Sequence, residues 1–344
     1  MRIGGMFVPE SIGEMRNDIP DGLLFCMSGR CALYACLADM GCTANSVAYV
    51  PSYTCETVLS AYCKAGYRLR FYDVDPEGLK PRFRIEDLDG VSVLSLCGYY
   101  GFSTYDETFV RLCHERGIII LHDTTHTPFA PDPLADYWAG SFRKWMGIAC
   151  GGVAHKASGK FNIMLLEPDT EHLQGRYLAM EERKQALETH DASFDEKAGQ
   201  TFWTTELRLR NMFGMFGSDQ QSEDVLTHYD FVSMIKKRRE NFRTIASNVS
   251  RQLGWKPVFQ YLDERAVPSH YALYAEDRDK MSAYLSGQGI KSTVYWPIPP
   301  MINDISRYPG TQWIDHHILS VPLDQRYSRS DMEFLASVLD AYGA

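Results

Sequence analysis

The chain has 344 residues, 45% of them hydrophobic and 23% charged, and a formal net charge of −9. This composition is that of a globular chain long enough to bury a core without disulfides, and it excludes general disorder. The acidic balance argues against general binding to nucleic acid or to an anionic membrane surface. No apolar stretch approaches the roughly 20 residues that span a bilayer, and the N-terminus lacks the apolar core of a signal peptide. We therefore expect a cytoplasmic protein that binds neither nucleic acid nor membrane.

The first 155 residues alternate between helical and strand patterns. Ser28-Gly29 begins a helix whose apolar residues recur at i, i+3, i+4 and i+7 up to Gly41. The elements expected after it are, in order, a strand over 46–50, a helix around 58–63, strands over 69–72 and 91–96, a helix around 109–113 and a strand over 118–121. The strand segments are apolar without alternation, which is typical of parallel strands buried on both faces. Repeated units of this kind predict an α/β domain whose central sheet is mostly parallel and flanked by helices.

The middle of the chain, from about residue 171 to 248, is helical and more highly charged. We expect Trp203, Leu207, Met212 and Phe213 to anchor these helices through apolar contacts. The basic run at 236–239 is interpreted as a solvated helix face, because most short charge runs face water.

The last hundred residues show a second, smaller α/β pattern. A strand over 269–275, a helix up to Leu285 and a strand over 293–296 are expected, and the residues 330–333 predict a capping box for the last helix. We place a domain boundary near residue 240. Residues 1–240 then form a large cofactor-binding domain with an N-terminal arm over 1–20, and residues 241–344 form a small C-terminal domain.

The nine cysteines all lie in the first 150 residues, and no two of them form a CxxC pair. We therefore expect reduced thiols and no metal site. The signatures GxxxxGK[ST], HExxH and GxGxxG are also absent from the sequence.

Two residues stand where a parallel sheet would place a ligand. Asp123 follows the apolar run 118–121 with one residue between, and ligands of such sheets bind beyond the carboxyl ends of the strands; capping of the next turn is the structural alternative. Lys144 lies among aromatic residues, so its amine either reaches solvent or is desolvated with a lowered pKa.

Together with a Ser-Gly helix start and a serine three residues before the lysine, these residues are the parts that a pyridoxal phosphate (PLP) enzyme needs. The N–H groups of a helix N-terminus bind phosphate. An aspartate keeps the pyridine nitrogen protonated, and a lysine forms the Schiff base and moves the substrate's proton.

The chain resembles the DegT–StrS family of PLP-dependent aminotransferases, which have the fold type I architecture and act largely on keto-sugars attached to nucleotides. The similarity runs from about residue 25 to the C-terminus. The segments that carry it are SGRCAL at 28–33, VPSYTC at 50–55, YDVDP at 72–76, YG at 100–101, DTTH at 123–126, SFRK at 141–144 and LSVPL at 319–323.

By position, this resemblance implies that Lys144 is the Schiff-base lysine and Asp123 the partner of the pyridine nitrogen. It implies His126 beside the cofactor's 3′-oxygen and Cys55 where relatives stack an aromatic ring. The residues implied at the phosphate are Ser28, Gly29, Arg30 and Ser141. Cysteine stacks poorly, so Tyr53 or another ring is the alternative at that position. The resemblance also implies a homodimer, because fold type I sites are shared between subunits.

The leading functional hypothesis is an aminotransferase that takes an amino group from an amino acid, with glutamate as the expected donor. The acceptor would be a keto compound such as a nucleotide-linked keto-sugar. A PLP-dependent lyase, dehydratase or racemase is the alternative, because the cofactor carries the chemistry in all of these. A non-catalytic binding protein on the same fold is a third hypothesis, which the presence of Lys144 argues against.

Overall fold

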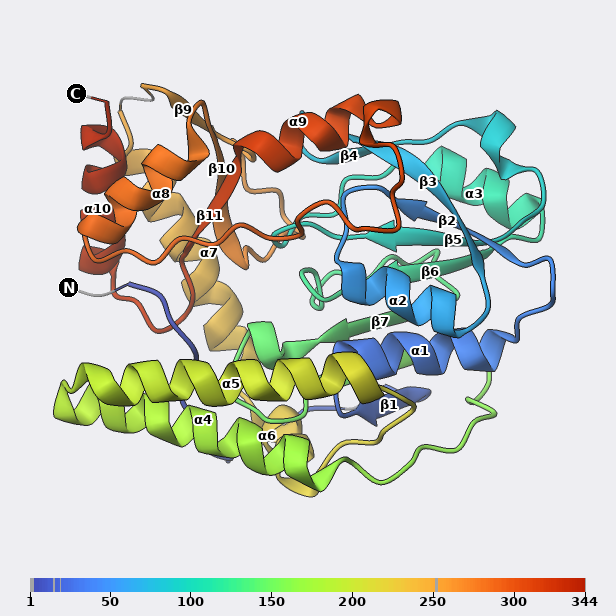
Figure 1. The fold of residues 1–344 in the computed structure, drawn as a ribbon, viewed down its shortest axis with the longest axis horizontal. Helices are drawn as coiled ribbons and strands as arrows, with labels where there is room; N and C mark the ends of the chain where they lie inside the picture. The colour runs from blue at the N-terminus through green and yellow to red at the C-terminus, as the bar shows by residue number, and fades with distance from the viewer. Residues whose placement is uncertain (1–2, 15, 19, 251–252, 344) are drawn as a thin grey trace.

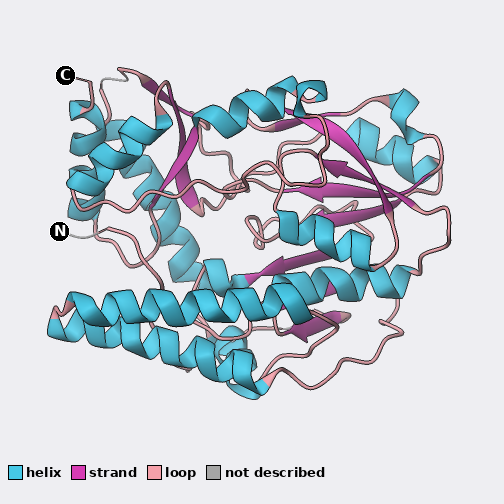
Figure 2. Cartoon of the chain, in the orientation of Figure 1, coloured by secondary structure: helices cyan, strands magenta, loops and turns pink. Residues whose placement is uncertain are grey.

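The computed structural model describes residues 3–14, 16–18, 20–250 and 253–343. They form one large sheet flanked by helices and one small sheet with helices of its own (Figures 1 and 2). The predicted α/β class, with a mostly parallel central sheet and a smaller C-terminal unit, is confirmed. Within the described ranges, every helix is too short or too polar to cross a membrane.

The large sheet has eight strands in the order β1-β8-β7-β6-β5-β2-β3-β4. Its five central strands are mutually parallel, and they are β7 (Tyr137–Ser141), β6 (Ile119–Asp123), β5 (Val91–Cys97), β2 (Val47–Pro51) and β3 (Arg68–Asp75). Antiparallel strands complete the two ends, and they are β1 (Leu23–Cys26), β8 (Gly152–Lys156) and β4 (Lys80–Arg82). The parallel centre brings the carboxyl ends of five strands to one edge of the sheet.

Both faces of β2, β5 and β6 are buried, as their continuous apolar sequences predict, whereas β3 is only partly buried. In β2, Ala48 and Val50 pack into one core cluster together with residues of α1 (Gly29–Met40) and α2 (Glu56–Lys64). Tyr49 points to the other face and belongs to a second cluster, which α3 (Glu107–Glu115) and the small domain share.

Helix α1 begins and ends at the predicted residues. The Ser28 side chain accepts a hydrogen bond from the backbone N–H of Cys31, which caps the helix start. Gly41 follows the last residue with a φ of 72°, a backbone conformation that glycine adopts without steric cost.

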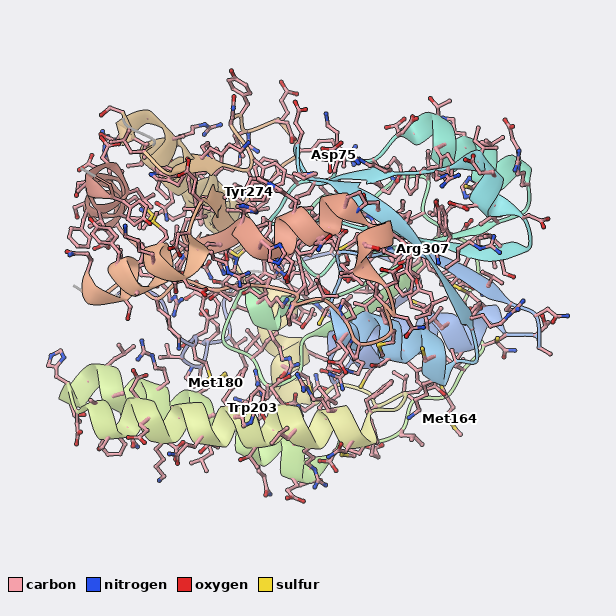
Figure 3. The ribbon with its side chains drawn as sticks, turned by 45° about the horizontal axis from the view of Figure 1, so that its top comes forward. Asp75, Met164, Met180, Trp203, Tyr274 and Arg307 are labelled. Atoms are coloured by element: carbon pink, nitrogen blue, oxygen red, sulfur yellow. The ribbon has the colours of Figure 1, made fainter. Side chains whose placement is uncertain are left out.

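The middle of the chain forms four helices, of which α4 (Thr170–Thr189) and α5 (Ala192–Met212) pair side by side along one edge of the molecule (Figure 1). They are followed by α6 (Gln220–His228) and α7 (Phe231–Asn248). Of the expected apolar anchors, Phe213 is buried in the core. The expectation is wrong for Trp203 and Leu207, because their side chains on α5 are 52% and 42% exposed; Figure 3 labels Trp203 on this helix.

The interpretation of residues 236–239 as a solvated helix face is wrong at Arg238. This side chain is fully buried, and it donates hydrogen bonds to the carbonyl oxygens of Ser269 and Trp145. A guanidinium has five N–H donors, so it can join several chain segments that lie apart in the sequence.

The small sheet is antiparallel, in the order β11-β10-β9. Its strands are β9 (Trp255–Pro257), β10 (His270–Ala275) and β11 (Ile318–Pro322), and the helices around it are α8 (Arg278–Gly287), α9 (Pro309–His317) and α10 (Arg329–Ala341). Tyr274, labelled in Figure 3, donates from its hydroxyl to the Pro76 carbonyl and so links the two sheets. Residue 240, where we place the domain boundary, lies within α7, and the boundary stays a prediction.

Two local predictions in the small domain are wrong. Residues 293–296 do not form a strand, because only Thr293 bridges to Ser320 and the backbone of Trp296 turns to a φ of 55°. A left-handed φ ends the extended conformation that a strand requires. The capping box of α10 uses Ser328 and Asp331, two residues before the predicted position.

Candidate active site

The residues singled out by the sequence meet at the carboxyl edge of the parallel sheet. Asp123 ends β6, and across the sheet its register partners are Cys97 on β5 and Ala139 on β7. Ser141 ends β7 and leads directly into the 3₁₀ turn Phe142–Lys144, which carries the lysine. The topology therefore brings Asp123 and Lys144 together although 20 residues separate them.

Lys144 lines a cavity of about 420 Å³. Its Nζ lies 2.8 Å from Nε2 of His126 and 4.6 Å from the centre of the Tyr295 ring. Desolvation lowers the pKa of Lys144, and the nearby Cys55 and Asp123 oppose that shift. Of the two sequence-based alternatives for this lysine, the desolvated one describes its surroundings.

His126 is buried and makes hydrogen bonds through both ring nitrogens. Its Nδ1 lies 3.2 Å from Oγ of Ser269, and its ring packs edge-on against Trp296, with 4.8 Å between the ring centres. Burial, together with the charge of Lys144, keeps the pKa of His126 well below its usual range, so the imidazole is neutral. A protonated Lys144 can only donate, so His126 then accepts at Nε2 and donates from Nδ1 to Ser269.

Asp123 is buried, with 9% of its surface exposed. Its carboxylate accepts a hydrogen bond from the backbone N–H of Thr125, so it does cap the following turn, as the structural alternative proposed. Desolvation raises the pKa of Asp123, while the hydrogen bonds from Thr125 and the charge of Lys144 work in the opposite direction. A cation placed beside this carboxylate would favour its ionised form.

The start of α1 lies against the end of β7. A Cβ added at Gly29 would come within 2.9 Å of the Ser141 Cβ, so this close approach requires glycine. The first helical hydrogen bond runs from the N–H of Ala32 to the carbonyl of Ser28, which leaves the N–H groups of Gly29 and Arg30 ahead of it for another acceptor. These donors and the Ser141 hydroxyl could hold a phosphate group.

The side chain of Arg30 points toward α5. Its Nη1 donates to the carbonyl of Leu209 at 2.9 Å, and the guanidinium lies 5.1 Å from the centre of the Phe213 ring. The Nε atom has no hydrogen-bond partner among the described residues. Contact of Arg30 with a phosphate therefore stays a prediction that rests on its backbone N–H.

Several aminotransferases of known structure share this arrangement of elements with the chain. The putative sugar aminotransferase Spr1654 from Streptococcus pneumoniae, in its PLP form, superposes with a TM-score of 0.69 at 14% identity, covering 98% of each chain. A DegT DnrJ EryC1 StrS aminotransferase from Brucella abortus gives 0.67 at 16% identity, covering 94% of this chain and 86% of the other. The aminotransferase TlmJ from Streptoalloteichus hindustanus gives 0.66 at 17% identity, with 93% and 85% covered.

The chain has the fold of the DegT–StrS aminotransferases. The sequence itself matches no family model and no curated protein. The resemblance inferred from seven short segments is thus confirmed at the level of the fold, where the likeness extends over nearly the whole chain.

Within this fold, Cys55 lies at the N-terminus of α2, and its Sγ lies 3.0 Å from the Thr57 hydroxyl. Tyr53, the alternative ring, is buried and stacks on Tyr99, with 5.5 Å between the centres. The aromatic rings next to Lys144 belong to Tyr295 and Trp296.

Sequence reasoning missed four residues of the small domain that lie at the site. Ser269, His270, Tyr295 and Trp296 surround the pair of Lys144 and His126, and a chain of hydrogen bonds joins His126 to Ser269 and Ser269 to His270. The aromatic pair 295–296 was the available signal, but its apolar character favoured a strand. Within the described residues, no group of His, Cys, Asp and Glu could hold a metal ion.

Proposed function

We propose that the protein is a PLP-dependent aminotransferase that moves an amino group from an amino-acid donor to a keto acceptor. One observation carries the proposal. The desolvated Lys144 forms a hydrogen bond with the buried, neutral His126 and lies close to the buried Asp123. These residues meet at the carboxyl edge of the central sheet, in a chain whose fold is similar to that of a sugar aminotransferase.

The residues present fit PLP. The close contact of Gly29 with Ser141 brings helix N–H donors and a hydroxyl together for the phosphate. Asp123 provides a buried carboxylate for the pyridine nitrogen, and Lys144 provides an amine for the aldehyde carbon. When bound, the cofactor supplies an electron sink for the substrate's Cα.

The chain's own residues then handle the proton. Desolvation raises the fraction of Lys144 that is neutral, and a neutral Nζ can take the proton from the substrate's Cα and hold it for delivery to a different carbon, as amino transfer requires. Nε2 of His126 accepts a hydrogen bond from Nζ and so fixes the direction of the amine. The rings of Tyr295 and Trp296, whose centres lie 4.6 and 5.6 Å from this atom, contribute to its desolvation.

The finer parts of the proposal rest on the family resemblance. Glutamate is the proposed donor, a nucleotide-linked keto-sugar the proposed acceptor, and the cytoplasm the proposed location. A homodimer is proposed as the active form, and the exposed apolar residues Trp203 and Leu207 on α5 support it.

The first test is the visible absorption spectrum of the purified protein with PLP, before and after addition of L-glutamate. We expect a band from lysine-bound cofactor that changes on addition. Lys144→Ala should remove this band and lower amino transfer more than about 100-fold, since general acid–base groups contribute that much or more. Lys184→Ala, which replaces an exposed lysine on α4, is the control and should keep both the band and the activity.

Each outcome separates the hypotheses. A band that responds to no amino-acid donor would favour the lyase, dehydratase or racemase alternative. A protein that takes up no PLP, or a Lys144→Ala variant with full activity, would overturn the proposal.

A further inference from the structure

The cavity beside Lys144 carries an excess of positive charge. Among the described residues that line it, six are lysine or arginine and two are aspartate. The six cationic residues are Arg143, Lys144, Arg176, Arg183, Lys291 and Arg326.

The charges of two of these arginines are neutralised by neighbouring carboxylates. Arg183 pairs with Asp195. Arg326 pairs with Asp324 at 2.8 Å and donates to the carbonyl of Gly5 in the N-terminal segment. These two arginines hold the structure together and leave no charge for a ligand.

Arg143 and Arg176 are not balanced in this way, because they share one carboxylate. Glu206 on α5 lies 3.1 Å from Nη1 of Arg176 and 3.5 Å from Nη1 of Arg143. Nε of Arg176 and Nη1 of Arg143 are buried, and neither has a hydrogen-bond partner among the described residues. The side chains of Arg143 and Arg176 are 13% and 6% exposed.

Without a further anion, the desolvation of these two guanidiniums costs free energy that one carboxylate does not offset. Desolvation and the charge of Arg143 lower the pKa of Arg176 to about 9, so this guanidinium is still charged at neutral pH. Two largely buried cations with one carboxylate and unused N–H donors match the geometry of an incoming carboxylate or phosphate. Such an anion would offset the desolvation of the second cation.

We propose that Arg143 and Arg176 form a binding site for an oxyanion of the substrate, in the same cavity as Lys144. The oxyanion is a carboxylate of the amino donor or a phosphate of the acceptor. The site differs from the expected cofactor phosphate site, since Ser28, Gly29 and Ser141 are not among the residues that line this cavity. The inference rests on the proposed function only in assigning the anion to a substrate.

The test measures anion binding to the PLP-treated full chain by isothermal titration calorimetry, with glutarate and inorganic phosphate as the two probes. Arg143→Gln and Arg176→Gln should each weaken binding of the preferred probe about tenfold, as expected for loss of a charged hydrogen bond. Glu206→Gln should tighten binding several-fold, because it removes the competing carboxylate. Arg111→Gln, which replaces an exposed arginine on α3, is the control and should change nothing.

The opposite signs of the arginine and glutamate variants distinguish a binding role from a structural one, which would make all three variants weaker. If Arg176→Gln does not fold, Arg143→Gln and Glu206→Gln still distinguish a binding role from a structural one. Binding of glutarate alone assigns the site to a carboxylate, and binding of phosphate alone assigns it to a phosphate. Unchanged affinity in Arg143→Gln, or no binding of either probe to the wild-type chain, would overturn the inference.

PLP content, measured on the same samples, separates two further results. If Arg143→Gln loses PLP while probe binding is retained, the arginines serve the cofactor, and the inference is wrong. If the wild-type chain takes up no PLP but the anion titrations follow the expected pattern, the proposed function fails while the anion site stands.

Discussion

The state of Lys144 depends on neighbours from three parts of the chain. Asp123 comes from the end of β6, His126 from the turn that follows, and Tyr295 from the small domain. Burial disfavours the ammonium form, and Asp123 partly restores it. The balance leaves an amine that can both hold and release a proton, which is what a lysine with two roles in one reaction needs.

At the scale of single residues, we predict that the hydrogen bond from Lys144 to His126 affects the reaction rate more than the imidazole ring itself does. His126→Gln offers an amide oxygen to Nζ and should keep the rate of the glutamate half-reaction within about tenfold of wild type. His126→Leu removes the acceptor and should cost about 100-fold. Stopped-flow absorbance of the PLP-loaded variants measures both rates. Equal rates for the two variants would show that this hydrogen bond does not orient the lysine.

At the scale of elements, α1 is held at both ends. Near its start, Arg30 donates to the Leu209 carbonyl of α5. Near its end, the fully buried carboxylate of Asp39 accepts hydrogen bonds from Tyr137 of β7 and Lys156 of β8. The N-terminus of α1 and the end of β7, which form the expected phosphate site, are thus fixed relative to each other by contacts at the opposite end of the helix.

We predict that Asp39→Asn lowers the free energy of unfolding by about 3 kcal/mol at pH 7, because it leaves the Lys156 ammonium without its buried partner. Although burial by itself would raise it, the hydrogen bonds from Lys156, Asn162 and Tyr137 hold the pKa of Asp39 below its ordinary value. A carboxyl whose pKa is lowered on folding stabilises the protein above its unfolded pKa, and this contribution is lost as the pH falls through the folded value. The difference between variant and wild type should therefore be constant down to about pH 4.5 and shrink below it.

Urea unfolding followed by circular dichroism across this pH range measures the effect. Asp89→Asn, at an exposed position, is the control and should stay within about 0.5 kcal/mol of wild type. A gap between Asp39→Asn and wild type that widens on acidification would contradict the assignment.

At the scale of the whole molecule, the exposed face of α5 carries large apolar side chains that no other described part of the single chain fully covers. Trp203 and Leu207 are one helical turn apart, so they lie on the same face, and both are about half exposed. Large apolar side chains that share one exposed face are typical of protein interfaces.

We predict that the protein is a homodimer and that this face contributes to its interface. Trp203→Asp combined with Leu207→Asp should weaken dimerisation at least tenfold, because a charge would be buried against apolar surface. Light scattering coupled to size-exclusion chromatography measures the mass against protein concentration. Val232→Asp, at a highly exposed position on α7, is the control. A dimer that the double variant leaves intact would place the interface elsewhere, and a monomeric wild type would reject the prediction.

The sequence predicted the βα units of the large domain closely, because each depends on local information. The start of α1 follows from Ser28 as a cap and its end from Gly41, and the buried strands follow from apolar runs without alternation. Prediction failed where tertiary contacts outweigh local preference. Arg238 lies within a basic run and yet is buried, because carbonyl groups of Trp145 and Ser269 converge on it.

By itself, the sequence determined the α/β class, since strand ends are readable along the chain, and its resemblance to the family supplied the roles proposed for Asp123, His126 and Lys144. Only the tertiary structure decided what surrounds the lysine. Tyr295 and Trp296 lie next to it although more than 150 positions separate them from it in the sequence, and Arg143 and Arg176 meet at one carboxylate because α4 and α5 pack together. The physical reason is that desolvation and charge balance depend on which groups are close in space, and sequence spacing carries no information on such contacts.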